Sequence, residues 1–206
     1  MSKKLYIFPF NGNGLEALDC LGKEHEFSGF IDDTPSKLGK NAFGHDVYDR
    51  SILEKEKENL VLAVPGSPAS YKIRHEIIAG LKLSDDRFAT VIHPKASVSP
   101  LAKIGKNVLI MAGVVITSNA VIEDHVCILP NTVIHHDCII KKYTLIGSNV
   151  SVAGGTEIGE NCYVGSGSKI MNNIKVGNGT LIGLGSNVIK TLGSNIKVAG
   201  NPAREI

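Results

Sequence analysis

Aliphatic residues recur at every sixth position through the C-terminal half of the chain. From Val98 to Val188, sixteen consecutive positions at this spacing hold isoleucine or valine. The position four residues after each of them, from Ala102 to Ser186, is nearly always small. A period of six fits neither an α-helix nor a β-hairpin sheet, but it is typical of a parallel β-helix with triangular coils. Each flat side uses six residues, so the repeats predict about five coils.

The aliphatic side chains of this repeat are expected to fill the interior of the prism. Each would stack on its counterpart one coil away, with neighbouring coils about 4.8 Å apart, the usual strand spacing. Cys138 and Cys162 fall on the small inward position, where a thiol behaves as a small apolar group. Cys127 falls elsewhere in its repeat, and nothing nearby in the sequence would activate it.

The first 90 residues follow a different pattern, in which strand-like runs alternate with helical ones. Residues 5–8, 27–31 and 59–64 are strand candidates, and residues 68–82 carry apolar side chains at helical spacing. This alternation indicates a small, Rossmann-like parallel α/β sheet. We therefore predict an α/β domain at residues 1–90 and a β-helix domain at residues 91–206.

Three loops follow these strand candidates and should converge, because ligands of such sheets bind beyond the carboxyl ends of the strands. The candidate binding residues on these loops are Asn11, Gly12, Asn13, Gly14, Asp32, Asp33 and Gly66. A glycine-rich turn that opens a helix can present backbone N–H groups to a phosphate, although it is equally typical of a plain tight turn. Paired aspartates after a strand are more often turn caps than ligand contacts.

A polar triplet, His135, His136 and Asp137, stands inside the aliphatic repeat. Because Ile134 is an inward position, the triplet occupies the following side and corner, and His136 projects outward. Gly154 lies in the stacked coil, where its missing side chain would leave room beside the imidazole. A histidine whose tautomer is fixed by an adjacent carboxylate can act as a general base. On the residues alone, a catalytic group and a solvated strand face both stay open.

Composition and charge narrow the classes of partner. The formal net charge is +2 without a basic stripe, so nucleic acid is not indicated. The longest apolar stretch, residues 108–116, is too short to span a bilayer, and no leader-like sequence precedes the first strand candidate. The four cysteines form no CxxC pair. We expect a cytoplasmic protein with reduced thiols, without a membrane partner, a zinc site or a disulfide framework.

The six-residue repeat and the ending VAGNPAREI, residues 198–206, resemble the hexapeptide-repeat acyltransferases. With the N-terminal segment included, the whole chain resembles the bacterial acetyltransferases that act on UDP-, dTDP- or GDP-linked amino sugars, and the related sialic acid O-acetyltransferases. GFIDD, residues 29–33, matches the family stretch that contacts the nucleotide. Gly66 matches the third loop of the family, and residues 91–105 match its entry into the β-helix.

This resemblance implies a left-handed β-helix, a homotrimer, and acetyl-CoA bound in the groove between adjacent β-helices. It also implies roles for individual residues. His136 would be the catalytic base and Asp137 the carboxylate that orients it, while Gly154, Ser166 and Gly183 would contact CoA.

Two positions depart from the family pattern. Asn13 stands where the first turn of the family usually has a histidine, and Leu145 stands where a second histidine often contacts acyl-CoA. We therefore expect altered contacts to the base, the sugar or the acyl group. His135 is expected to be a solvated neighbour of the base.

The leading hypothesis is an acetyl-CoA-dependent N-acetyltransferase for the 4-amino group of a nucleotide-linked 4-amino-4,6-dideoxy sugar, in surface polysaccharide or glycan biosynthesis. O-acetylation of a sialic-acid-like sugar is the alternative, and an inert β-helical scaffold is a third possibility. A zinc-dependent carbonic anhydrase with a trimeric β-helix would need three converging histidines. The spacing of His125, His135 and His136 does not fit such a site, so we expect no metal.

Overall fold

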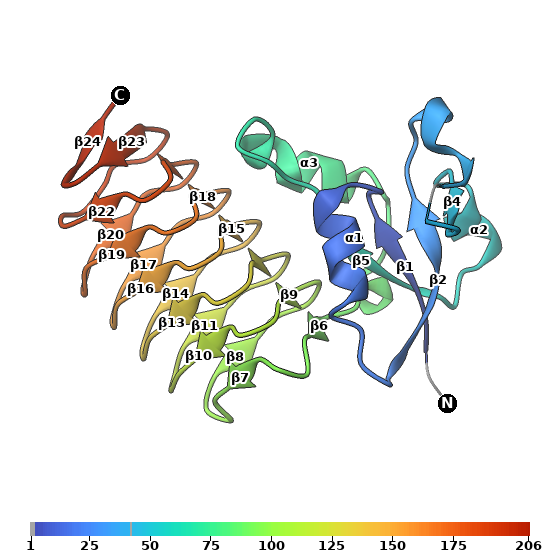
Figure 1. Ribbon diagram of the computed structural model, residues 1–206, viewed down its shortest axis with the longest axis horizontal. Coiled ribbons are helices and arrows are strands. Elements are labelled where there is room, and N and C mark those ends of the chain that lie inside the picture. Colours follow the sequence, from blue (N-terminus) through green and yellow to red (C-terminus); the bar gives the residue numbers. More distant parts are fainter. Residues whose placement is uncertain (1–2, 42) are drawn as a thin grey trace.

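The computed structural model describes residues 3–41 and 43–206, and it contains an N-terminal sheet region followed by a long β-helix (Figure 1). In the N-terminal region, β1 (Lys3–Phe8) lies between β2 (His25–Ile31) and β5 (Leu60–Ala63), and both pairs are parallel. The sheet continues beyond β2 with β4 (Asp46–Tyr48), also parallel, and with β3 (Gly39–Lys40), which is antiparallel to β4. The sheet is thus mixed at one edge, whereas the sequence pattern predicted only its parallel centre.

Helices cover both faces of this sheet. They are α1 (Gly12–Leu18), α2 (Ile52–Lys55) and α3 (Arg74–Ala79), with the short 3-10 turns η1 (Pro35–Lys37), η2 (Tyr71–Ile73) and η3 (Asp85–Arg87). One face packs Leu5, Ile7 and Phe30 with Ala17 of α1. The residues on the opposite face pack against Leu53 of α2, against α3 and against the segment that follows α3.

The β-helix is built from short parallel strands that form three faces, which we call faces I, II and III. Face I contains β6 (Val91–Ile92), β9 (Leu109–Ile110), β12 (Cys127–Ile128), β15 (Leu145–Ile146), β18 (Tyr163–Val164), β21 (Leu181–Ile182), β23 (Lys197–Gly200) and the antiparallel β24 (Ala203–Glu205). Face II contains β7 (Ser97–Val98), β10 (Val115–Ile116), β13 (Val133–Ile134), β16 (Ser151–Val152), β19 (Lys169–Ile170) and β22 (Asn187–Val188). Face III contains β8 (Lys103–Ile104), β11 (Val121–Ile122), β14 (Ile139–Ile140), β17 (Glu157–Ile158) and β20 (Lys175–Val176).

The interior of the prism confirms the repeat predicted from the sequence. From Val98 to Val188, the second residue of each two-residue strand points inward and joins a single apolar core, in which Val98 and Ile104 are only partly buried. Small residues at the corners complete this core, and Cys138 and Cys162 are both fully buried there. Buried hydroxyls at the same position are satisfied: Thr132 donates to the carbonyl of Gly147 at 2.7 Å. A buried polar group needs such a partner, because burial without one is costly.

From Asn107 to Gly185, every corner of the prism turns through a residue with positive φ. Along the corner between faces II and III these residues are Asn119, Asp137, Gly155 and Asn173. Asn and Gly adopt this conformation more readily than other residues. Asp137 shares it, so the corner that carries the polar triplet has the same backbone shape as its neighbours.

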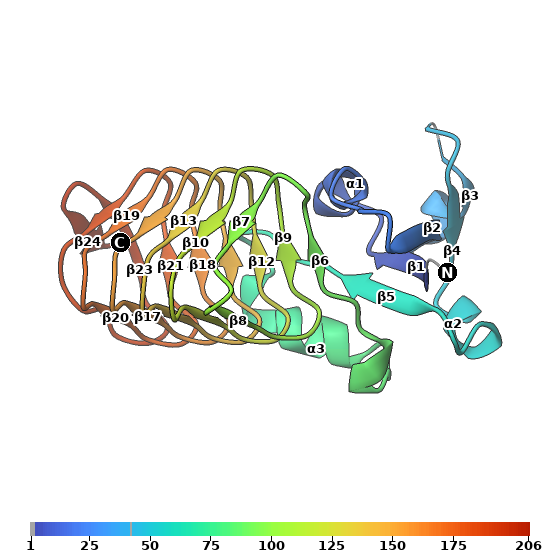
Figure 2. The ribbon, with the colours of Figure 1, turned by 90° about the horizontal axis from the view of Figure 1, so that it is seen from below.

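The N-terminal region is docked on face I of the β-helix. The outward side chains of Leu109, Cys127 and Leu145 belong to the same buried cluster as one face of the N-terminal sheet. In Figure 2, α3 runs beside the edge of the β-helix, and the Tyr71 hydroxyl of η2 donates to the carbonyl of Gly179 at 3.2 Å. The side-chain amide of Asn107 pairs with the backbone of Ala63: Oδ1 accepts from the Ala63 N–H, and Nδ2 donates to the Ala63 carbonyl.

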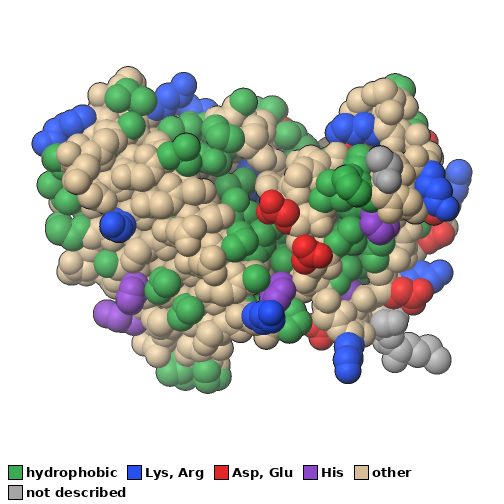
Figure 3. Space-filling view, viewed as in Figure 1, with side chains coloured by type: hydrophobic (Ala, Val, Ile, Leu, Met, Phe, Trp, Pro, Cys, Tyr) green, Lys and Arg blue, Asp and Glu red, His purple; other side chains and the backbone are tan. Residues whose placement is uncertain are grey.

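Charge is distributed unevenly between the two regions. In Figure 3 acidic and basic side chains gather over the N-terminal region at the right, whereas the visible face of the β-helix is largely apolar or uncharged. No helix in the described part of the chain is long and apolar enough to cross a membrane.

Candidate functional site

The turn between β13 and β14 holds His136 and Asp137 as hydrogen-bonded neighbours on the outside of the corner between faces II and III. Nδ1 of His136 lies 2.7 Å from Oδ2 of Asp137. Because a carboxylate accepts hydrogen bonds, Nδ1 carries the proton and donates it, which leaves Nε2 as the free acceptor. Asn119, one coil earlier, donates from Nδ2 to Oδ1 of Asp137 at 3.2 Å. The carboxylate is therefore held from two sides, and the imidazole is held in one tautomer.

These hydrogen bonds also determine the charge of Asp137. The bond from His136, and after it the bond from Asn119, lower the pKa of the Asp137 carboxyl. It is therefore ionised at neutral pH and can stabilise a protonated imidazole. The His136 and Asp137 side chains are 65% and 57% exposed, so the pair lies on an open surface of this chain.

Gly154 supports the imidazole ring from the next coil. A Cβ atom at this position would lie 2.6 Å from both Nε2 and Cε1 of His136, closer than such atoms approach in practice. The absence of a side chain at Gly154 therefore allows the His136 ring to lie against the prism while it is bonded to Asp137. The expectation that a thioester lies beside the imidazole at this position stays a prediction.

The three loops that follow β1, β2 and β5 converge, as the sheet pattern predicted. Together they line a hollow of about 460 Å³, which we call the loop pocket. Of the seven candidate residues on these loops, Asn11, Asp32, Asp33 and Gly66 line it. The convergence follows from the parallel pairing of β1 with β2 and β5, which brings the carboxyl ends of these strands to one edge.

The first loop is shaped by its own hydrogen bonds. Asn11 caps α1, because its Oδ1 accepts from the backbone N–H of Gly14 at 2.8 Å. A Cβ atom on Gly14 would lie 2.3 Å from the carbonyl oxygen of Pro9, so this turn requires glycine. Asn13 donates from Nδ2 to the carbonyl of Gly66 at 3.3 Å and so ties the first loop to the third. Gly12 has open space around its Cα.

The two aspartates of the second loop are each paired with a cation. Asp32 is buried, and its Oδ2 accepts from Nζ of Lys37 at 2.7 Å. Burial acts to raise the pKa of Asp32, but the hydrogen bonds from Lys37 and Thr34 outweigh it and lower the pKa below its ordinary value. Asp33 accepts from the guanidinium of Arg50, and this bond lowers its pKa. Both carboxylates are thus ionised and neutralised within the protein.

The architecture of this chain is similar to that of known proteins. A family model described as the GMPPB C-terminal domain matches residues 88–184. The acetyltransferase domain of PglB from Neisseria gonorrhoeae FA1090, in complex with acetyl coenzyme A, has a TM-score of 0.87 at 26% identity, with 100% of both chains covered. The chain thus has the fold of the hexapeptide-repeat acyltransferases, with a left-handed β-helix, and it is an acyltransferase.

Two further solved structures share the fold of this acyltransferase. PerB from Caulobacter crescentus, in complex with CoA and GDP-perosamine, has a TM-score of 0.85 at 24% identity, covering 100% of this chain and 98% of the other. WeeI from Acinetobacter baumannii AYE has a TM-score of 0.82 at 22% identity, with 100% of both chains covered. A search of curated proteins finds no significant match.

The loop pocket and His136 lie on opposite sides of the acyltransferase chain. The N-terminal region covers face I, whereas His136 stands at the corner between faces II and III. In a triangular prism this corner is the one opposite face I. A molecule held in the loop pocket therefore cannot reach His136 of the same chain without passing around the prism.

The predicted CoA contacts are divided between two corners. Gly154 lies at the corner between faces II and III, whereas Ser166 and Gly183 lie at the corner between faces I and II. The Ser166 hydroxyl accepts from the backbone N–H of Ser148 at 3.0 Å, and the Gly183 carbonyl accepts from the Ser186 hydroxyl at 2.7 Å. Within one chain the structure does not bring these three residues together.

Leu145 lies far from the base of its own chain. It is buried on face I, and its Cδ1 would lie 3.1 Å from a Cβ atom on Gly66. The side chain at this position thus supports the third loop from behind. The expectation that it alters the acyl contact stays a prediction.

Other residues of the loop pocket were not singled out from the sequence. Lys37, Ser67 and Ser70 also line it, and the two serine hydroxyls are 3.0 Å apart. Lys37 follows Asp32 by five residues, a spacing that could have indicated the ion pair if the intervening turn had been recognised. Asn119 could have been found by stepping back one coil, eighteen residues, from Asp137.

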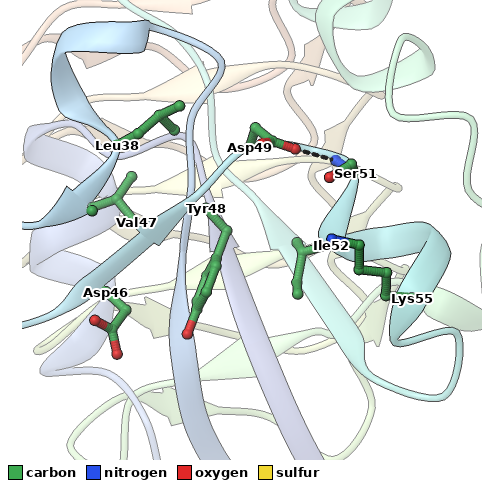
Figure 4. Close-up of a pocket in the computed structure, with 9 residues that line it drawn as sticks. Leu38, Asp46, Val47, Tyr48, Asp49, Ser51, Ile52 and Lys55 are labelled. Carbon is green, nitrogen blue, oxygen red and sulfur yellow. Dashed lines mark hydrogen bonds between the residues drawn. The ribbon is translucent and has the colours of Figure 1, made fainter.

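The remaining candidates lie outside these two clusters. Figure 4 shows a second hollow, of about 280 Å³, which is lined by residues of the β3–β4 hairpin, among them Tyr48, and by Ile52 and Lys55 of α2; none of the predicted site residues lines it. His135 is half-buried beside His136, and its backbone N–H donates to the carbonyl of Val152. Within residues 3–41 and 43–206, no group of three or more His, Cys, Asp or Glu side chains could hold a metal ion.

Cys127 is buried where face I meets the N-terminal region. Burial raises the pKa of its thiol to about 11. The thiol is therefore protonated and unreactive at neutral pH.

Proposed function

We propose that this acyltransferase transfers an acetyl group from acetyl-CoA to the 4-amino group of a nucleotide-linked 4-amino-4,6-dideoxy sugar, a step in surface polysaccharide or glycan biosynthesis. The observation that carries the proposal is the hydrogen-bonded His136–Asp137 pair with its free Nε2, in a fold shared along its full length with an acetyltransferase domain that binds acetyl-CoA. The solved complex of PerB with CoA and GDP-perosamine supports the nucleotide-sugar part.

The chemistry follows from the protonation state of the pair. The amine attacks the thioester carbonyl carbon, and Nε2 of His136 accepts the proton that the amine loses. Asp137 stabilises the imidazolium, because its carboxylate stays ionised and accepts from Nδ1. The tetrahedral intermediate then releases the CoA thiolate, which takes up the proton, and the amide is formed. General base catalysis of this kind contributes about 10²- to 10⁴-fold to the rate.

The loop pocket is the proposed site of the nucleotide diphosphate. Lys37 supplies a positive charge at its wall, and the hydroxyls of Ser67 and Ser70 supply donors. These groups suit phosphate oxygens, which accept hydrogen bonds and prefer cations. Asp32 holds Lys37 in place through the 2.7 Å ion pair.

A homotrimer brings the two clusters together. Because the loop pocket lies opposite His136 on the same prism, we propose that the amine bound by one chain reacts at His136 of its neighbour. The groove between two β-helices can then combine Gly154 of one chain with the Ser166 and Gly183 corner of the next, as acetyl-CoA would require. The open surface of His136 and Asp137 supports this arrangement, since the second chain forms the missing wall.

The test measures CoA release with a thiol reagent, using acetyl-CoA and a panel of UDP-, dTDP- and GDP-linked 4-amino sugars plus free sialic acid. We expect turnover with an amino sugar, and a 10²- to 10⁴-fold lower kcat for His136→Ala. His135→Ala is the matched control and should keep most of the activity. Turnover with sialic acid alone would assign O-acetylation instead. Unchanged turnover in His136→Ala would reject this residue as the base.

A further inference from the structure

Arg74 of α3 carries a buried positive charge at the junction of the two regions. Its side chain is only 1% exposed. Nη2 donates to the carbonyl of His125 at 3.1 Å, and Nη1 donates to the carbonyl of Tyr143 at 3.3 Å. Nε is buried without a hydrogen-bond partner among the described residues. Burial lowers the pKa of Arg74 to about 10, so the guanidinium is still charged at neutral pH.

No carboxylate in the described part of the chain forms an ion pair with Arg74. The nearby acids of the second loop are already neutralised, Asp32 by Lys37 and Asp33 by Arg50. An unpaired buried charge is costly, and two carbonyl oxygens compensate it only in part. The region around the loop pocket therefore has a positive charge in excess, and it lacks an anion.

The guanidinium lies directly behind the wall of the loop pocket. A Cβ atom on Gly66 would lie 2.9 Å from Cδ and 3.3 Å from Nε of Arg74. Gly66 lines the loop pocket on its other side, and its φ of +142° is one that residues with a side chain rarely adopt. Asn13 holds the Gly66 carbonyl from the first loop. The backbone of Gly66 thus borders both the loop pocket and the Arg74 side chain, which does not line the pocket itself.

We propose that Arg74 determines specificity for the anionic part of the substrate: its charge behind Gly66 favours ligands whose phosphates lie against the third loop. This inference rests on the proposed function, because it assigns the diphosphate of the nucleotide sugar as the missing anion. Attraction through a thin wall of protein is screened much less than attraction across solvent. Arg74 therefore complements Lys37, which is partly exposed on the pocket wall.

The experiment compares wild type, Arg74→Gln, Arg74→Lys and the control Lys72→Gln, which removes the same charge from an exposed position two residues away. GDP, UDP, dTDP and the corresponding nucleosides are titrated by calorimetry, and acetyl-CoA is titrated alongside. For Arg74→Gln we expect Kd of the preferred diphosphate to rise about tenfold or more. Kd of the nucleoside and of acetyl-CoA should change less than about twofold, and Arg74→Lys should restore most of the loss.

A merely structural role gives a different pattern. If Arg74 only held the carbonyls of His125 and Tyr143, Arg74→Gln would weaken diphosphate, nucleoside and acetyl-CoA together, or leave all three unchanged; either result overturns the inference. If neither Arg74 variant folds, the crystal structure of wild type with the preferred diphosphate decides. A phosphorus atom within about 8 Å of the guanidinium, the screening length at physiological salt, supports the proposal, and a greater distance overturns it. If wild type binds none of the diphosphates, the proposed function fails and this inference fails with it.

Discussion

The two regions of this protein place polar residues in opposite ways. In the β-helix, the backbone repeats from coil to coil, and a functional residue replaces an ordinary one without changing the chain path. Asp137 lies in a line of corners whose other members are Asn119, Gly155 and Asn173, all with positive φ. In the N-terminal region no element repeats another, and the loop pocket exists only because three different strands end at one edge.

This difference explains how the two clusters depend on their surroundings. His136 needs only the adjacent Asp137, and two positions in neighbouring coils, Asn119 and Gly154. The loop pocket needs the docking of the whole N-terminal region on face I, because Gly66 lies against Arg74 and Leu145. The β-helix thus supplies a rigid corner for chemistry, while the junction between the regions shapes the binding site.

The prediction with the largest expected effect tests whether the loop pocket and the His136–Asp137 pair of one active site come from different chains. His136→Ala removes the base, and Ser67→Trp is designed to fill the loop pocket. Each variant alone should be nearly inactive. When the two are co-expressed and assemble at random in a trimer, about a quarter of the sites combine an intact pocket with an intact histidine from the neighbouring chain. We therefore expect roughly a quarter of the wild-type turnover.

The control for this mixture is co-expression of each variant with itself under a second tag. Mixed assemblies that are recovered through both tags and stay inactive would show that pocket and base work within one chain. That outcome would contradict the opposite placement of face I and the corner between faces II and III as the basis of the site.

An intermediate effect is expected from Gly154→Ala. The new methyl group would lie 2.6 Å from the His136 ring, and the ring, which is exposed on its other side, can rotate away. The hydrogen bond between Nδ1 and Asp137 would then be lost while the fold stays intact. We expect kcat to fall about 10²-fold, as it does when a catalytic group is displaced, with Tm and the KM of the nucleotide sugar little changed.

Gly193→Ala is the matched control for Gly154→Ala. It adds the same methyl group to the β-helix at a position where nothing lies within 4 Å. Steady-state kinetics and a thermal melt on both variants separate displacement of the base from a general effect of alanine. Equal kcat in the two variants would reject the role assigned to Gly154.

The contrast between the repeating β-helix and the non-repeating N-terminal region also explains how much of the structure could be predicted from the sequence. The six-residue period predicted the inward positions of the β-helix, because each coil repeats the same contacts. It also placed His136 on the outside, in the turn between the inward positions Ile134 and Cys138. The left-handed (positive φ) conformation of the corner residues was not predicted, although Asn, Gly and Asp recur three residues after the inward aliphatic residue. That signal was present in the sequence and could have shown that the corner turns through Asp137 itself, with positive φ.

The N-terminal region was less predictable for a physical reason. Its central strands are apolar runs and were recognised, but β3, β4 and α2 lie in the largely polar segment 35–58, where no period stands out. Arg74 occupies one position of an apolar helical pattern, and only the docking on face I buries it. Contacts that depend on how two regions meet cannot be derived from the pattern of either one.

The smallest expected effect concerns this junction and its dependence on pH. His125 lies at the corner between faces III and I, where its ring stacks on Tyr143 with the ring centroids 4.7 Å apart. Burial lowers the pKa of His125 to about 4, and the positive charges of Arg74 and Lys142 act in the same direction, against the opposing effects of Asp124 and Asp85. The unfolded chain therefore binds a proton at His125 more readily than the folded chain does. The contribution of His125 to the free energy of unfolding is therefore fully present above pH 6.5, and it is lost as the pH drops from there towards 4.

Replacing His125 with Asn removes this dependence and keeps the corner, because asparagine holds the equivalent position with positive φ one coil earlier, at Asn107, and two coils later, at Asn161. The loss of ring packing should lower stability equally at all pH values. Between pH 7 and pH 4.5, wild type should lose about 2 kcal/mol more than His125→Asn, as the pKa difference between unfolded and folded states requires. Urea denaturation of both proteins at the two pH values measures this difference. Equal losses of stability in wild type and His125→Asn would show that the docked N-terminal region does not keep His125 neutral. The junction between face I and α3 would then be more open to solvent than it is in this structure.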